Sequence, residues 1–134
     1  MDRATQRRVR ERAAGVCEYC RARQDDEPYY SYQIEHVIPK QHGGSDHDSN
    51  LALACPHCNR HKGPNLASLD PFDDALTPLF NPRTQNWDDH FARRGPLIMG
   101  QTAVGRASVR VLNMNDRWRV QARAALDASA GDDT

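Results

Sequence analysis

The sequence predicts an α+β domain with three parts: a strand–loop–strand–short helix core, a structural zinc ion that holds it, and a helical C-terminal extension. Two Cys-x-x-Cys pairs bracket the core, and helical spacing of apolar residues returns near the end of the chain. A length of 134 residues fits one domain, and an apolar fraction of 38% gives a thin core that benefits from a metal. We expect one domain over residues 1–134, with the core at 10–65 and an extension at 66–134 packed on it.

The first elements are a helix and a strand. Residues 5–14 are rich in Arg, Glu and Ala, and Gly15 is a typical helix stop. The segment from Tyr29 to Val37 is rich in Tyr and β-branched residues and precedes Pro39, which favours a strand.

The second half of the core follows a polar loop. Residues 41–49 contain Gly, His, Asp and Ser without periodicity, which indicates a loop. Residues 51–54 form a short apolar run typical of a strand. Pro56 suits the first position of a helix, which Gly63 and Pro64 then end.

The extension is less regular. Residues 64–86 hold four of the eight prolines, and we expect an irregular arm that packs its apolar side chains on the core. Residues 87–91 and 97–100 could pair as a hairpin. Helical spacing then returns over 103–112 and 116–128.

Four cysteines are the strongest chemical signal. Cys17/Cys20 and Cys55/Cys58 each place two thiolates on one turn, and together they complete a closed tetrahedral zinc site. A closed site has no open position, so this ion should hold the fold. A redox pair or an iron centre would use the same residues. The N-terminus has no apolar signal segment and no stretch is long enough to span a membrane, so we expect a cytoplasmic protein.

Charge is neutral overall but unevenly distributed. Residues 1–23 carry seven Arg against three acids, residues 93–123 carry seven against one, and residues 63–92 carry five Asp against one Arg. Basic ends around an acidic middle suit a polyanion held at defined places, although solvated helix faces would give the same pattern.

A second group of polar residues suits phosphodiester hydrolysis. His36 can take a proton from water, and the oxygens of Glu35 and Asn59 suit Mg²⁺ or Mn²⁺. Asn50 can hydrogen-bond across the loop and orient the histidine. Neighbouring strand residues face opposite sides, so Glu35 and His36 share one site only if the strand bends or bulges. Each residue alone also has an ordinary structural explanation.

These residues follow a known pattern. Glu35-His36-x-x-Pro39, His42-Gly-Gly, Asn50-Leu and Cys55-x-x-Cys58-Asn59-x-x-Lys62 together resemble the HNH endonuclease family, in the version with a CxxC pair on each side of a ββα-metal (His-Me finger) core. The resemblance covers about residues 10–65.

The resemblance implies a role for each matching residue. His36 would be the general base, Asn50 the residue that positions it, and Glu35 with Asn59 the holders of the catalytic ion. Asn59 occupies the third position of the HNH motif, where Asn in place of His favours Mg²⁺. His61 is a further candidate ligand. The phosphate contacts that we expect are Lys40, His42, Arg60 and Lys62.

The sequence therefore predicts metal-dependent cleavage of DNA, with RNA as a substrate left open. The alternative is a non-catalytic zinc module that binds nucleic acid or protein, which needs the cysteines but not Glu35, His36 or Asn59. A redox protein is a third possibility, and it predicts titratable thiols without bound zinc.

Overall fold

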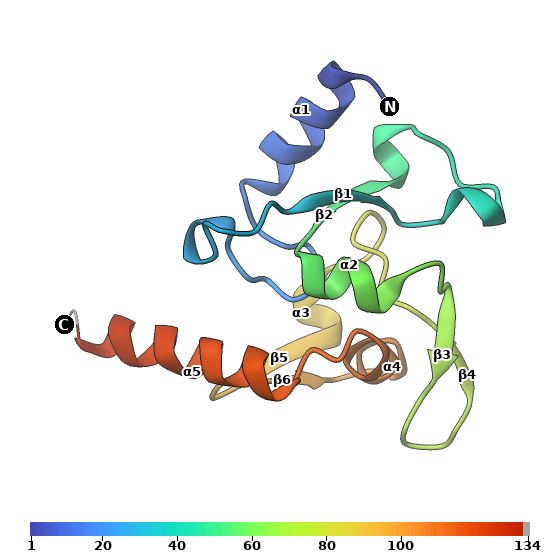
Figure 1. Cartoon of the computed structure of the whole chain (residues 1–134). Helices are drawn as coiled ribbons and strands as arrows, with labels where there is room; N and C mark the ends of the chain where they lie inside the picture. Colours follow the sequence, from blue (N-terminus) through green and yellow to red (C-terminus); the bar gives the residue numbers. More distant parts are fainter. Residues whose placement is uncertain (133–134) are drawn as a thin grey trace.

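The computed structural model describes residues 1–132, and its centre is a small antiparallel hairpin between two helices (Figure 1). Strand β1 pairs with β2 along four residues, from Gln33 opposite Ala54 to His36 opposite Leu51. Two further two-stranded sheets, β3–β4 and β5–β6, belong to the C-terminal half. The helices and strands are α1 (Arg3–Ala13), β1 (Gln33–His36), β2 (Leu51–Ala54), α2 (Pro56–Lys62), β3 (Ala67–Leu69), β4 (Leu76–Pro78), α3 (Trp87–His90), β5 (Phe91–Arg94), β6 (Leu97–Gly100), α4 (Ala103–Val111) and α5 (Arg117–Asp132).

Helix α1 starts earlier than the sequence predicted because Asp2 caps it. The Asp2 carboxylate accepts a hydrogen bond from the Thr5 backbone N–H at 2.8 Å, which satisfies one of the free donors of the first turn. The helix ends at Ala13, and the next two residues, Ala14 and Gly15, both have positive φ, as the expected stop requires.

Strand β2 is buried along its whole length, which explains why its sequence is a continuous apolar run. Strand β1 is shorter than predicted, because the Gln24 side chain holds the two preceding tyrosines in a turn. Its oxygen accepts from the Tyr32 N–H at 2.7 Å and its amide donates to the Tyr30 carbonyl. Tyr29 is consequently 94% exposed rather than part of a sheet.

Helix α2 follows β2 directly and has the predicted start and end. Pro56 occupies its first turn, and the Cys55 sulfur caps it by accepting from the Cys58 N–H at 3.4 Å. Gly63, with φ of +48°, ends the helix. The strand–loop–strand–helix order of the core is therefore confirmed, and the fold is a mixed α/β arrangement of small sheets and helices.

The segment expected to be irregular contains a hairpin instead. Strands β3 and β4 pair in register, and the turn between them is closed by the Asp70 N–H donating to the Ala75 carbonyl at 2.9 Å. The buried Asp70 carboxylate accepts two hydrogen bonds from Arg106, at 2.9 and 2.8 Å, which fixes the hairpin to α4. Leu79 and Phe80 pack inside as expected, whereas Phe72 and Leu76 at the hairpin are exposed.

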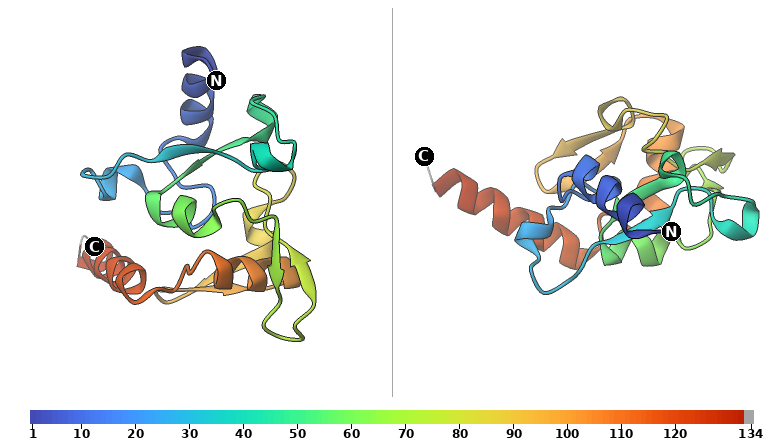
Figure 2. Two further views of the ribbon diagram at one scale, coloured as in Figure 1. Left: turned by 45° about the vertical axis from the view of Figure 1, so that its right-hand side comes forward. Right: turned by 90° about the horizontal axis from the view of Figure 1, so that it is seen from above.

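The second predicted hairpin exists, but its first strand is shifted. Residues 87–90 form the short helix α3, and the strand that pairs with β6 begins only at Phe91. Both predicted C-terminal helices are present, and α5 extends away from the rest of the molecule in each view (Figures 1 and 2). Within residues 1–132 no helix combines the length and the apolar character needed to cross a bilayer.

Contacts between the core and the C-terminal half are buried and specific. The Trp87 indole N–H donates to the Tyr19 carbonyl at 2.7 Å, and its ring stacks on Phe91 at 5.1 Å between centroids. Arg83 forms an ion pair with Glu18. The shared core contains buried residues of both halves, among them Tyr19, Tyr32, Leu53, Phe80, Trp87, Phe91, Ile98, Leu112 and Met114.

Candidate active site and metal centre

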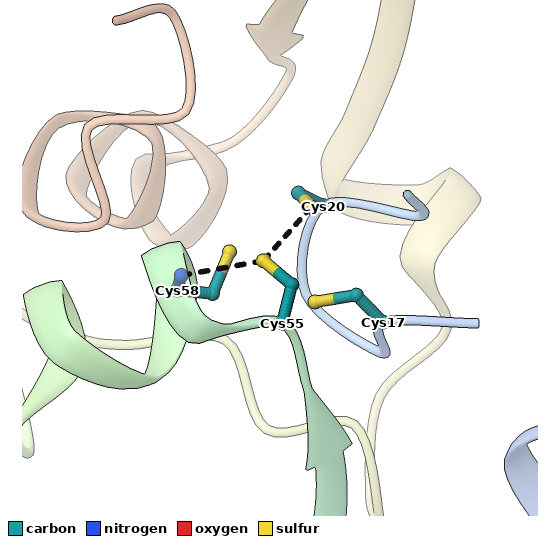
Figure 3. Close-up of side chains that lie close together, drawn as sticks. All are labelled: Cys17, Cys20, Cys55 and Cys58. Atoms are coloured by element: carbon teal, nitrogen blue, oxygen red, sulfur yellow. Dashed lines mark hydrogen bonds between the residues drawn. The ribbon is translucent and has the colours of Figure 1, made fainter. Parts of the chain in front are cut away.

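The four cysteines meet in one buried cluster, as the sequence predicted (Figure 3). Cys17 and Cys20 come from the loop after α1, Cys55 from the end of β2 and Cys58 from the first turn of α2. Their sulfur atoms all lie within 4.8 Å of one another. Soft thiolate ligands at this spacing are positioned to bind a single metal ion.

The surrounding structure holds the cluster in place. The backbone of Glu18 donates to the Leu53 carbonyl at 2.9 Å, and its carboxylate accepts from the Leu53 N–H at 2.8 Å, so the loop that carries Cys17 and Cys20 is tied to β2. Arg119 of α5 lies 3.9 Å from the Cys20 sulfur and pairs with Glu27. A guanidinium beside several thiolates offsets their negative charge, so the C-terminal half contributes to the metal centre.

A second site is an open hollow of about 570 Å³ at the end of the β1–β2 hairpin. His36, Glu35 and Asn59 line it together with the cationic side chains Lys40 and Arg60. The sequence predicted roles for all five residues, and the fold brings them to one surface from β1, the following loop and α2.

His36 lies at the edge of the hollow with its ring fixed by a carboxylate. Its Nε2 atom is 2.7 Å from Oδ1 of Asp46, a loop residue that the sequence interpretation did not single out. Lys40 lies 3.1 Å from the same oxygen. The hydrogen bonds from His36 and Lys40 lower the pKa of Asp46 to about 2, so Asp46 is an anion at neutral pH.

Asn50 braces the loop rather than touching the histidine ring. Its side chain accepts from the Ile38 N–H at 2.9 Å and donates to the carbonyls of Ile38 and Ser45 at 3.0 and 2.9 Å. Gly44 lies beside these hydrogen bonds, where a Cβ atom would come within 1.6 Å of the Ile38 oxygen. The Gly-rich sequence of the loop therefore reflects close backbone approach around Asn50.

Glu35 is buried beneath the hollow. Tyr19 donates a hydrogen bond to Oε1, and the Lys62 amine lies 3.3 Å from Oε2. Burial raises the pKa of Glu35, while Lys62 and Tyr19 act in the opposite direction. Of the bend or bulge that the sequence required in β1, a bulge is absent, since Gln33 to His36 pair in continuous register. Glu35 and His36 nevertheless both line the hollow at the end of the strand.

Asn59 and His61, both on α2, have different surroundings. The Asn59 amide nitrogen donates to the Gln33 side chain, which leaves the Asn59 oxygen free to accept or to bind a cation. His61 is not among the residues lining the hollow. Its Nδ1 atom donates to the His57 carbonyl at 2.8 Å and its ring packs against His57, so the structure gives no support to His61 as a second-choice ligand.

Lys62 requires a correction. We expected a phosphate contact, but Lys62 is only 2% exposed, and its amine donates to the carbonyls of Val37 and His36 at 3.0 and 3.3 Å. A long side chain near the end of a short helix can turn inward as easily as outward, and here the buried Glu35 carboxylate supplies a partner for its charge. Lys40, His42 and Arg60 remain exposed.

Sequence reasoning missed two side-chain contacts of the site, that of Asp46 with His36 and that of Tyr19 with Glu35. Asp46 lies in the polar loop beside other Ser, His and Asp residues, and nothing in the sequence distinguishes it from an ordinary loop residue. Tyr19 lies between two cysteines of the metal-binding cluster, 16 positions from its partner Glu35. The partners in these contacts are 10 and 16 positions apart, so only the folded structure identifies them.

Comparison with known proteins gives two matches. Residues 17–65 match the family model described as HNH endonuclease. Septu protein PtuB from Bacillus thuringiensis is 28% identical over 106 residues, which cover 78% of this chain and 38% of the relative, so the chain spans well under half of that protein. No solved structure gives a significant match.

Proposed function

We propose that this chain, which carries an HNH endonuclease domain at residues 17–65, is a metal-dependent endonuclease that hydrolyses phosphodiester bonds in DNA. The observation that supports it most is the hollow in which His36, Glu35 and Asn59 meet beside Lys40 and Arg60. A proton acceptor, oxygen ligands for a hard cation and positive charge for a phosphate are the three requirements of this reaction.

The four-cysteine centre is proposed to bind structural Zn²⁺. A tetrahedral zinc ion with Zn–S bonds of about 2.3 Å places its sulfur ligands about 3.8 Å apart. The Cys20 and Cys55 sulfur atoms are 3.8 Å apart, so the donor set fits that ion. Because all four positions are thiolates, this ion would stabilise the fold and take no part in hydrolysis.

The catalytic cation is proposed to be Mg²⁺ or Mn²⁺, held by Glu35 and Asn59. Both residues line the hollow and offer hard oxygen atoms, which fits an ion that binds few protein ligands and keeps several waters. When bound, such an ion would stabilise negative charge on the phosphate oxygens and on the leaving oxygen. Lys62 and Tyr19 hold Glu35 at the hollow from below.

His36 is proposed to take a proton from the attacking water. Asn50 would support it indirectly, by bracing the loop between β1 and β2 that follows the histidine. Lys40 and Arg60 line the same hollow and would contact the phosphates on either side of the scissile bond. His42 is an exposed neighbour on the same loop and is the weaker candidate for such a contact. The thiol-rich metal centre supports a reducing, cytoplasmic location.

The test is nicking of supercoiled plasmid DNA by the purified protein in Mg²⁺, in Mn²⁺ and in EDTA, with a structured RNA as a second substrate. We expect DNA cleavage with either ion and none in EDTA. Cleavage that persists in EDTA, or that occurs only with RNA, would contradict the proposal.

A non-catalytic zinc module is the second candidate, since the Glu35 carboxylate already has two protein partners. That module predicts DNA or protein binding without cleavage at any metal concentration. Binding and cleavage measured on the same preparation therefore separate the two functions. Binding through Lys40 and Arg60 should weaken with salt, and Arg60→Ala should reduce the salt dependence of log K by about one.

A further inference from the structure

The His36–Asp46 contact gives the histidine a second partner besides any substrate water. His36 is the last residue of β1, and Asp46 lies ten residues later in the loop that leads to β2. Their closest atoms are 2.7 Å apart. The His36 side chain is 22% exposed and that of Asp46 is 39% exposed, so the contact lies at the rim of the hollow. Such a short distance requires a proton between the two atoms.

The chemistry of the two groups decides where that proton is. An ionised carboxylate can only accept, so the proton on the shared bond belongs to Nε2 of His36. In the neutral ring the other nitrogen, Nδ1, then carries the lone pair. No other described residue forms a hydrogen bond with Nδ1, which leaves it free to accept a proton from water.

The loop is built to keep Asp46 in place. Lys40 holds the same carboxylate oxygen at 3.1 Å. The carbonyl of Ser45, the preceding residue, accepts from Asn50, and Gly44 allows the backbone to close tightly around that side chain. Asn50 thus acts on His36 indirectly, through the loop that carries Asp46.

We propose that Asp46 is a positioning residue, which fixes the orientation of the His36 ring and, when the ring is neutral, keeps the proton on Nε2 and the lone pair on Nδ1. The ring orientation and tautomer are properties of the folded protein. The consequence for catalysis rests on the proposed nuclease function. A histidine without this partner would sample both tautomers and more than one ring orientation, and only part of the population could accept a proton from water.

The direct test is the tautomer of His36 in protein labelled with ¹⁵N-histidine, with the resonance assigned by His36→Ala. At a pH at which the ¹⁵N shifts themselves show a neutral ring, we expect the Nε2–H form in the wild-type protein. The Nδ1–H form in the wild type would overturn the proposal, and this measurement does not require an active enzyme.

Variants then test the role of the carboxylate. Asp46→Asn keeps the shape but allows an N–H donor to face the ring, so we expect a shift toward the Nδ1–H form and a fall in kcat of about 10–100-fold with KM little changed. Asp48→Asn is the matched control, because Asp48 lies in the same loop and pairs with Arg8. Its His36 tautomer and kcat should match the wild type.

The outcomes separate this proposal from the nuclease assignment. An Asp46→Asn protein with wild-type tautomer and kcat would refute the positioning role. A wild-type protein with the Nε2–H tautomer that cleaves no nucleic acid would retain the His36–Asp46 assignment and refute the nuclease function instead.

Discussion

The amine of Lys62 lies 3.3 Å from Oε2 of Glu35, and the two side chains are only 2% and 6% exposed. The same amine donates to the carbonyls of His36 and Val37, so it binds both the carboxylate and the backbone at the end of β1. One buried cation on α2 therefore holds the strand that presents the proposed base and the proposed metal ligand.

Removing the Lys62 charge should lower the free energy of unfolding substantially. Lys62→Met keeps much of the apolar chain but leaves Glu35 with only Tyr19 as a partner, and breaking a buried pair in this way costs about 3–5 kcal/mol. Urea unfolding measures the change. Lys40→Met is the control, since the Lys40 side chain is 64% exposed, and its stability should stay within about 0.5 kcal/mol of the wild type. Equal stability of the two variants would show that the buried pair is unimportant.

The penalty of Lys62→Met should grow with pH. Burial already raises the pKa of Glu35 above its usual 4.5, and losing Lys62 raises it further. A carboxyl group with a raised folded pKa is stabilising below its unfolded pKa and loses that contribution as pH rises through the folded value. The stability gap between variant and wild type should be smaller at a pH of about 5 than at about 8. A gap that shrinks as pH rises would contradict this assignment.

Metal removal should unfold the protein. Structural zinc contributes on the order of 10 kcal/mol in small domains, which is comparable to the total stability typical of a domain of this size. The chain has no cysteines besides the four of the cluster. Thiol titration of the folded protein should find none reactive, and four after chelation, together with loss of the circular dichroism signal. Four freely reactive thiols in a stably folded protein would favour the redox alternative.

Replacing each of the two tryptophans by alanine should have very different effects on the stability of the protein. Trp87 joins the two halves through its hydrogen bond to the Tyr19 carbonyl, and Trp87→Ala should cost about 3–5 kcal/mol in unfolding free energy. Trp118 on α5 is 71% exposed, so Trp118→Ala should change stability by less than about 0.5 kcal/mol. Similar effects of both changes would mean that the extension does not pack on the core as one cooperative unit.

The parts of the molecule that were predictable are those coded locally. Strand β2 is a continuous apolar run, Pro56 and Gly63 set the ends of α2, and the cysteine spacing alone indicated the metal cluster. The signals for β2 and α2 lie within a few residues, and their physical causes act over the same short range. The cluster joins two cysteine pairs that are 35 positions apart, but each Cys-x-x-Cys pair is itself a local signal for a metal ligand.

The parts that were not predictable depend on distant partners. The β3–β4 hairpin forms in a proline-rich segment because Asp70 pairs with Arg106, 36 residues away. Tyr29 and Tyr30 have strand-forming side chains but lie in a turn, and the Gln24 amide donates to the Tyr30 carbonyl there. Lys62 has the sequence context of a surface lysine and turns inward because Glu35 lies beneath it. No local pattern distinguishes these outcomes from the ones we expected.

The nuclease assignment depends most directly on His36. The deciding measurement is the single-turnover rate of plasmid nicking in Mg²⁺ for the wild type beside His36→Ala, with circular dichroism showing that both are folded. Loss of a general base typically lowers the rate about 10²–10⁴-fold, and we predict a fall in that range with DNA binding retained. Equal rates in the two proteins would contradict the account, since the hollow would then not be the site of the chemistry.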